Sequence, residues 1–193
     1  MTGLVILAAG ESRRLGEPKQ NVLHNGESLL QHAVKTAVYS ACRPVIIILG
    51  AYAEEIQLQI KEQTVVIYHN PQWQEGMASS IRLGIKMLQQ TEAGVSAVIF
   101  MVCDQPHINT ELLDDLINTK SATGKDIVAS SYNNTLGVPV LFDKKFFPEL
   151  LLLKGEEGAK KLLLKHKTSL VSVPFPLGSI DIDTAKDYEA LIS

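Results

Sequence analysis

The stretch LAAGESRRLGEPK, from Leu7 to Lys19, overlaps the end of the apolar run Leu4–Ala8 and decides how the chain is interpreted. The run predicts a buried strand, and the glycines and proline after it predict a loop at the strand's carboxyl end. Open α/β sheets bind ligands at that edge. Small residues at positions 8–10 let the backbone approach a ligand, so successive N–H groups can cradle phosphate oxygens.

Two cations in this loop, Arg14 and Lys19, suit the same role, because arginine offers forked donors and lysine a compact charge. The spacing excludes two common phosphate loops. Five residues separate Gly10 from Gly16 and Glu17 follows, so neither G-x-x-x-x-G-K-[ST] nor G-x-G-x-x-G is present. From this segment alone, a glycine-containing turn with solvated arginines remains an alternative.

Further along, strand-length apolar runs alternate with helical patterns, which predicts an α/β fold with a mostly parallel sheet. We see no linker, repeat or charge block, and expect residues 1–193 to form a single domain. Strands are expected at Leu4–Ala8, Val45–Leu49, Thr64–Tyr68, Ala97–Val102, Ile127–Ala129, Val140–Phe142 and Leu170–Val173. Helices are expected at Ser28–Ala41, Glu54–Lys61, Ala78–Gln89, Thr110–Lys120 (capped by Thr110 or Asn109), Lys144–Leu153, Glu157–His166 and Ala185–Ile192.

Composition narrows the class of protein. A formal charge of -3 gives no general attraction to nucleic acid, so we expect no nucleic-acid partner. Apolar runs such as Val95–Cys103 are far shorter than the roughly 20 residues of a membrane span, so we expect no membrane contact. The N-terminus lacks a basic region before its first apolar run, which favours a cytoplasmic protein. Cys42 and Cys103 lack metal-type spacing and are interpreted as buried free thiols.

Two acidic segments are candidates for metal binding. Asp104 follows the apolar run Ala97–Val102 and should project at the same sheet edge as the first loop. Mg²⁺ prefers such hard oxygen ligands, although a turn aspartate before a proline is an alternative. Asp181 and Asp183 lie two apart before the last helix, so both face one side of an extended segment. Capping of that helix by Asp183 or Thr184 is the competing interpretation.

The segment GMASS, residues 76–80, begins a helix after a loop. Its hydroxyls and unpaired N–H groups suit the edge of a nucleobase and a ribose. Plain capping of the helix by a serine explains the same residues equally well.

Together these segments resemble the nucleotidyltransferases that activate sugar phosphates, isoprenoid precursors and molybdopterin. The chain is most similar to their molybdenum cofactor cytidylyltransferase and guanylyltransferase branch, the MobA-like NTP transferases. The first loop matches L-A-A-G-x-S-x-R-x-G-x-x-K, residues 76–80 resemble Gly-Met-x-Ser-Ser, and residues 181–184 match the start of Asp-Ile-Asp-Thr-Pro. Ala185 replaces the usual proline, which loses only a favourable first-turn residue. The resemblance implies a three-layer Rossmann-like fold with an N-terminal NTP-binding part and a C-terminal acceptor-binding part.

The resemblance also implies roles for individual residues. The catalytic residues would be Arg14, Lys19 and Asp104. Mg²⁺ would be held by Asp104 and Asp183, with Asp183 preferred over Asp181. The nucleotide would contact Leu7, Ala8, Ala9, Gly10, Arg14, Lys19, Ser79 and Ser80, with Ser80 the better of the two serines.

The acceptor half departs from the family pattern. Glu156 and Lys160 stand where the family usually has aspartate and arginine, which keeps the charges but changes their reach and geometry. We expect both to contact the acceptor, although a solvated helix face explains Lys160 as well.

The resemblance implies transfer of a nucleoside monophosphate from an NTP to molybdopterin or its molybdenum-loaded form. CTP is favoured over GTP, because residues 76–80 and 181–184 look closer to the cytidylyl branch. A molybdenum hydroxylase apoenzyme would be a further partner. Two alternatives stay open: a nucleotidyltransferase for a sugar phosphate or another phosphorylated acceptor, and a non-catalytic carrier or chaperone for the nucleotide cofactor.

Overall fold

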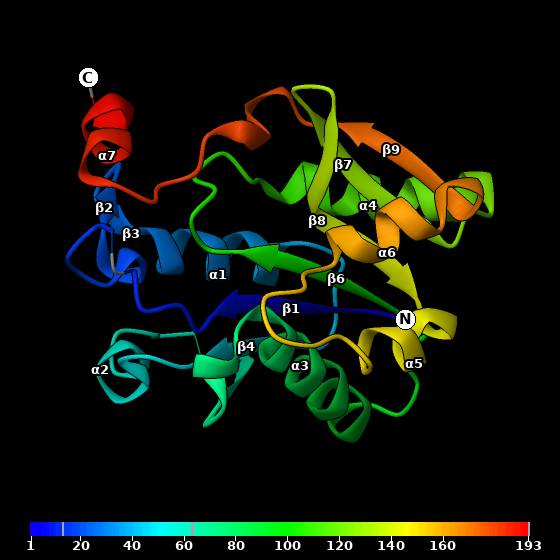
Figure 1. Ribbon diagram of the computed structural model, residues 1–193, viewed down its shortest axis with the longest axis horizontal. Helices are drawn as coiled ribbons and strands as arrows, with labels where there is room; N and C mark the ends of the chain where they lie inside the picture. Colours follow the sequence, from blue (N-terminus) through cyan, green and yellow to red (C-terminus); the bar gives the residue numbers. More distant parts are fainter. Residues whose placement is uncertain (13, 63, 193) are drawn as a thin grey trace.

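The computed structural model describes residues 1–12, 14–62 and 64–192. Seven strands among them form one sheet in the order β5-β4-β1-β6-β8-β7-β9, with helices on both sides (Figure 1). The strands are β1 (Thr2–Ala8), β4 (Val45–Leu49), β5 (Val65–His69), β6 (Ala97–Val102), β7 (Ile127–Tyr132), β8 (Thr135–Asp143) and β9 (Leu170–Pro174). A separate short hairpin pairs β2 (Leu23–His24) with β3 (Glu27–Ser28).

The sheet is mostly parallel, as the alternation of elements predicted. Strands β5, β4, β1 and β6 run parallel to one another. Strand β8 is antiparallel to both β6 and β7, and β9 returns parallel to β7. The carboxyl ends of β1 and β6 therefore meet at one edge, which brings the loop after Ala8 near the residues after Val102.

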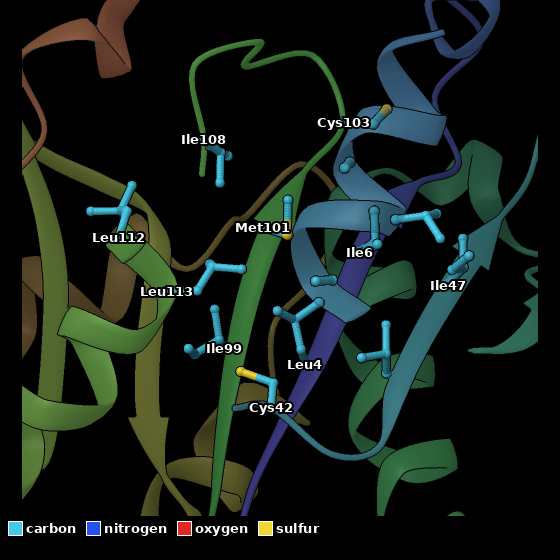
Figure 2. Close-up of a cluster of buried hydrophobic side chains, with 14 of the residues drawn as sticks. Leu4, Ile6, Cys42, Ile47, Ile99, Met101, Cys103, Ile108, Leu112 and Leu113 are labelled. Atoms are coloured by element: carbon cyan, nitrogen blue, oxygen red, sulfur yellow. The ribbon is translucent and has the colours of Figure 1, made fainter. Parts of the chain in front are cut away.

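Alternating side chains divide the core into two layers. Leu4 and Ile6 of β1 face one layer, which also contains the buried residues of α1 (Leu29–Tyr39) and α4 (Thr110–Thr123) (Figure 2). Val5 and Leu7 face the other, with α3 (Met77–Thr91), α5 (Phe147–Leu150) and α6 (Lys160–Lys165). Such alternation is what a strand covered on both faces requires. The three-layer α/β prediction is confirmed.

Helix ends are set by local hydrogen bonds. At α1, Ser28 Oγ accepts from Gln31 N at 3.2 Å and Gln31 Oε1 accepts from Ser28 N at 3.2 Å, which is a capping box. At α4, Asn109 Oδ1 accepts from Leu112 N at 2.9 Å, so Asn109 is the N-cap of the two predicted candidates. Both predicted free thiols, Cys42 and Cys103, are buried and unpaired.

Several predicted boundaries were wrong. The predicted helix Lys144–Leu153 is instead a 3-10 turn, η3 (Lys144–Phe146), followed by α5. Pro148 has no N–H to donate, so it fits only in the first turn of the new helix. Helix α6 begins only at Lys160, after Gly158, and α2 (Ala53–Gln57) is shorter than predicted. No helix in the described part of the chain is long and apolar enough to cross a membrane.

The strand predicted at Val140–Phe142 was too short, because β8 already begins at Thr135 and passes through Pro139. The pairing with β7 shifts register between Ala129 and Ser130, opposite this proline. Ser130 Oγ donates to the Pro139 carbonyl at 2.8 Å, and such irregularities let a strand accommodate a proline.

Candidate functional site

A cleft of about 500 Å³ opens where β1 and β6 end. One wall is the loop after β1, and the other is the turn that leads into α3. Sequence-predicted site residues that line it are Leu7, Ala8, Ala9, Gly10, Lys19, Ser80, Asp104 and Glu156. It is also lined by Glu11, Ser12, Trp73, Gln74, Gly76, Met77 and Val102, which the sequence analysis did not assign.

The loop after β1 is held by two side chains that sequence reasoning missed. Gln20 is fully buried, and its Nε2 donates to the carbonyls of Ala8 at 2.9 Å and Gly10 at 3.1 Å. Ser12 adopts the left-handed conformation, with φ of 58°, and its Oγ accepts from Lys19 N at 3.0 Å. These bonds fix a backbone loop beside the cleft, which is the arrangement that cradles phosphate oxygens.

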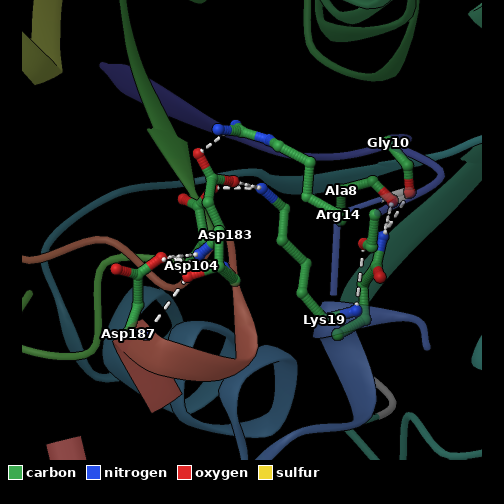
Figure 3. Close-up of polar contacts among 10 residues, drawn as sticks. Ala8, Gly10, Arg14, Lys19, Asp104, Asp183 and Asp187 are labelled. Carbon is green, nitrogen blue, oxygen red and sulfur yellow. Dashed lines mark hydrogen bonds and ion pairs between the residues drawn. The ribbon is translucent and has the colours of Figure 1, made fainter. Parts of the chain in front are cut away.

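A cluster of opposite charges includes Lys19 and Asp104, which line the cleft, and Arg14 and Asp183, which are not among the described residues that line it (Figure 3). Lys19 Nζ donates to Asp104 Oδ2 and to Asp183 Oδ1, the latter at 3.2 Å. Arg14 Nη2 donates to Asp183 Oδ2 at 2.7 Å. The four side chains come from the first loop, the end of β6 and the C-terminal segment, so the fold joins three distant parts of the sequence here.

Lys19 is charged in this cluster. Its side chain is 18% exposed, whereas that of Arg14 is 70% exposed. Burial by itself lowers the pKa of Lys19, but the charges of Asp104 and Asp183 outweigh it and raise the pKa overall. The ammonium group therefore neutralises two carboxylates that would otherwise repel each other.

The C-terminal segment is positioned by a buried side chain and a backbone bond. Ile182 is fully buried against Val22 and Leu29, and its N–H donates to the Asp104 carbonyl at 2.9 Å. Thr184 caps α7 (Ala185–Ile192), since its Oγ1 accepts from Asp187 N at 3.2 Å while Asp187 Oδ2 accepts from Thr184 N at 2.7 Å. The Asp183 carboxylate thus stays in the cluster while its neighbour caps the helix.

The two carboxylates fit a divalent cation. Asp104 Oδ1 is buried and has no hydrogen-bond partner in the described part of the chain, which leaves a hard oxygen donor unused. Asp183 lies across Lys19 from it. No group of three or more His, Cys, Asp or Glu side chains suited to a metal occurs among the described residues. A cation here would therefore complete its shell with phosphate oxygens and water, as Mg²⁺ commonly does.

The two predicted serines have different surroundings. Buried Asn70 donates from Nδ2 to Ser79 Oγ at 2.8 Å and to Ser80 Oγ at 3.0 Å. Ser79 Oγ then donates to the Gly76 carbonyl at 2.8 Å, whereas Ser80 lines the cleft. Asn70 was missed because its position in a loop gave no sign of a buried role.

Of the two residues predicted to contact an acceptor, Glu156 is exposed and lines the cleft. Lys160 is exposed at the first residue of α6 and is not among the described residues that line it. The chain's one tryptophan, Trp73, also borders the cleft. A Cβ at Gly50 would lie 2.6 Å from both the Ala9 carbonyl oxygen and Trp73 Cβ, so the glycine allows this close approach.

Comparison with known proteins gives one family match and several relatives of similar length. The model of a family described as "MobA-like NTP transferase domain" matches residues 4–170. Purine catabolism protein PucB of Bacillus subtilis (strain 168) is 26% identical, over 96% of this chain and 93% of its own. Nicotine blue oxidoreductase of Paenarthrobacter nicotinovorans is 24% identical, over 97% of this chain and 91% of its own. Molybdenum cofactor cytidylyltransferase of Escherichia coli (strain K12) is 20% identical, over 95% of this chain and 92% of its own.

Among solved structures, Rv0371c from Mycobacterium tuberculosis H37Rv superposes with a TM-score of 0.86 at 24% identity, covering 99% of this chain and 97% of that one. A complex of Rv0371C with manganese, from the same organism, superposes with a TM-score of 0.80 at 23% identity, covering 98% of this chain and 97% of that one. These likenesses show the shared fold.

Proposed function

The chain belongs to the MobA-like NTP transferase family, and we propose that it transfers CMP from CTP to the terminal phosphate of a molybdopterin-type acceptor, releasing pyrophosphate. The observation that carries this proposal is the ion-pair cluster of Lys19, Asp104 and Asp183, in which Lys19 and Asp104 line the same cleft as the backbone loop of residues 7–12. Phosphoryl chemistry is catalysed mainly by such positioning and charge.

The nucleotide occupies the part of the cleft between the first loop and α3. The backbone of residues 8–10 faces the triphosphate, with Arg14 and Lys19 contributing positive charge. Ser80 contacts the base or ribose, because its oxygen accepts from Asn70 and its hydroxyl hydrogen can be donated into the cleft. Ser79 supports this helix start through its bond to the Gly76 carbonyl.

Asp104 and Asp183 hold the divalent cation, for which we propose Mg²⁺. The buried, unpartnered Asp104 Oδ1 supports this assignment, as does the manganese complex of the structurally similar Rv0371C. When bound, the cation neutralises charge on the phosphates and polarises them.

The reaction needs no covalent enzyme intermediate. An acceptor phosphate oxygen forms a bond to the α-phosphorus in line with the bond to the β-phosphate, which breaks as pyrophosphate leaves. Lys19 exchanges contacts with its carboxylate partners for contacts with phosphate oxygens, and together with Arg14 it stabilises the charge that develops. Glu156, which lines the cleft, would contact the acceptor, and Lys160, at the exposed start of α6 outside the lining, would reach it only if its side chain extends toward the cleft.

The preference for CTP rests on the resemblance of residues 76–80 and 181–184 to the cytidylyl branch, and it requires a base pocket too short for two rings. A site that fits a pyrimidine excludes a two-ring purine, and each polar group left unpaired by the wrong base costs roughly 1–3 kcal/mol. We expect CTP with Mg²⁺ to bind more tightly than GTP, and Ser80→Ala to narrow the difference. Isothermal titration of both nucleotides measures this, and a clear preference for GTP would assign the guanylyl branch instead.

The identity of the acceptor is tested by measuring pyrophosphate release when each of the four NTPs is combined with each candidate acceptor. The candidates are molybdopterin, its molybdenum-loaded form and a set of sugar phosphates. The proposal expects release only with CTP and a molybdopterin. Release with a sugar phosphate would make the protein an activating enzyme of another kind. Nucleotide binding without release from any pair would indicate a carrier that hands a finished cofactor to an apoenzyme such as a molybdenum hydroxylase.

A further inference from the structure

The segment between α5 and α6, residues 151–159 and here called the acceptor loop, runs across to the start of α3 (Figure 1). Its Gly155 carbonyl accepts from Ala78 N at 3.0 Å. Gly76 has φ of 114°, and a Cβ there would lie 2.5 Å from the Gly155 carbonyl oxygen. The two backbones are thus in direct contact, and a side chain at Gly76 would separate them.

Arg82 makes the strongest tie between the two segments. Its Nη1 donates to the Leu153 carbonyl at 2.7 Å and to Glu75 Oε1 at 2.8 Å, while Nη2 donates to Glu75 Oε2 at 2.6 Å. Glu75 Oε1 also accepts from Gly155 N at 3.4 Å. The two guanidinium nitrogens bind both Glu75 carboxylate oxygens as a fork and leave a donor for the Leu153 carbonyl, a geometry that the single ammonium nitrogen of lysine does not reproduce.

These contacts join the two halves of the cleft. Arg82 lies two residues beyond Ser80 on α3, and Glu156 follows Gly155 directly. Ser80 and Glu156 both line the cleft. A shift of the acceptor loop would therefore change the separation between the nucleotide and acceptor parts, on which an in-line attack depends.

We infer that Arg82 is a positioning residue, which with Glu75 holds the acceptor loop against α3 and so sets the place of the acceptor relative to the nucleotide. This inference rests on the proposed function, since it assigns the acceptor to the side of Glu156. Arg82 itself does not line the cleft among the described residues. It acts through the loop, and its loss should affect the acceptor rather than the nucleotide.

The kinetic test compares Arg82→Gln, Arg82→Lys and wild type, with molybdopterin as acceptor and CTP with Mg²⁺ as donor. Lys120→Gln is a matched control, because Lys120 pairs with Asp143 at 2.8 Å and has a similarly covered side chain, away from the cleft. We expect Arg82→Gln to raise the KM for molybdopterin at least tenfold while the Kd for CTP, from isothermal titration, changes less than twofold. Arg82→Lys should be intermediate and Lys120→Gln unchanged. An unchanged acceptor KM, or an equal loss of CTP affinity, would overturn the inference.

A second readout needs no acceptor. Amide hydrogen exchange of residues 153–158 should be faster in Arg82→Gln than in wild type or Lys120→Gln. Glu75, the partner of Arg82, lies on the 3-10 turn η2 (Trp73–Glu75). Glu75→Gln should also make exchange of residues 153–158 faster, and it replaces Arg82→Gln in the test if that variant does not fold. Wild-type protein without turnover would contradict the proposed function, whereas unchanged exchange in folded variants would contradict the positioning role.

Discussion

Lys19 lies between Asp104 and Asp183, where its ammonium group neutralises both carboxylates. A divalent cation bound by the same two carboxylates must compete with it. If the proposed site binds both, we expect the binding of cation and nucleotide to require movement of this one side chain, because the phosphates offer Lys19 new partners as it leaves the carboxylates.

Replacing Lys19 separates its role as the counter-charge of the two carboxylates from its proposed role in phosphate transfer. Lys19→Ala leaves two carboxylates without their shared counter-charge, so we expect Mn²⁺ to bind more tightly in the absence of nucleotide, by about tenfold (1.4 kcal/mol). Transfer of the α-phosphate should fall more than CTP affinity does. Manganese EPR titration gives the first quantity and single-turnover kinetics the second. Lys86→Ala, at an exposed position of α3, is the control. Unchanged Mn²⁺ affinity would contradict the competition.

Sequence reasoning reached the charged residues of the site better than the polar ones that hold them. Arg14, Lys19, Asp104 and Asp183 stand in segments whose composition suggests phosphate or metal binding, and the fold brings them together. Buried amides such as Gln20 carry no such pattern. Gln20 acts on carbonyls 10 and 12 positions earlier, and only the three-dimensional path of the loop shows that these groups need a donor.

At the scale of elements, helix α1 follows the hairpin next to the first loop, and its start is defined by the capping box of Ser28 and Gln31. Ser28→Ala removes the acceptor of Gln31 N and should lower the free energy of unfolding by about 1 kcal/mol. Urea denaturation measures the change. Ser172→Ala, at an exposed position of β9, is the control and should leave the free energy of unfolding nearly unchanged. No loss in Ser28→Ala would show that the cap contributes nothing.

Prediction of elements succeeded where local pattern and tertiary structure agree. The parallel strands and α1, α3 and α4 have apolar residues at the expected spacing and were located within a few residues. Predicted boundaries were least accurate from Thr135 to Lys165, where strand β8 extends beyond Val140–Phe142 because it pairs with both β6 and β7. Such pairing lengthens a strand beyond what its local composition indicates.

At the scale of the whole molecule, the site depends on the complete fold. Arg14 and Asp183 are 169 positions apart in the chain, yet their side chains are paired. Loss of the C-terminal segment would remove one of the two carboxylates, together with the backbone bond from Ile182 to Asp104. The charge cluster is therefore complete only when the C-terminal segment is folded in place.

The core layer that contains Leu4 and Ile6 can be probed through the two buried thiols, Cys42 and Cys103. Burial raises the pKa of Cys103 to about 12 and that of Cys42 to about 11. Only thiolates react with iodoacetamide, so modification of the folded protein should stay slow from pH 7 to pH 9, whereas both thiols should react rapidly in urea. Both pKa values are higher in the folded protein than the ordinary thiol value of 9.0, so the unfolded chain loses these protons first as pH rises. The stability that the protonated thiols contribute is therefore fully present below about pH 9 and is lost as pH rises through the folded-state values of about 11 and about 12. Rapid modification of the folded protein would contradict the packed core.

CMP transfer at this cleft can be followed through the α-phosphate of CTP. Wild-type protein with α-³²P-labelled CTP, Mg²⁺ and molybdopterin should place the label in a dinucleotide product and release one pyrophosphate per label transferred. Asp104→Asn should melt within a few degrees of wild type yet transfer the label slower by orders of magnitude, because an amide is a weak ligand for a hard cation. Label that stays in CTP or appears as free CMP, or near-normal transfer by Asp104→Asn at low Mg²⁺, would contradict the account.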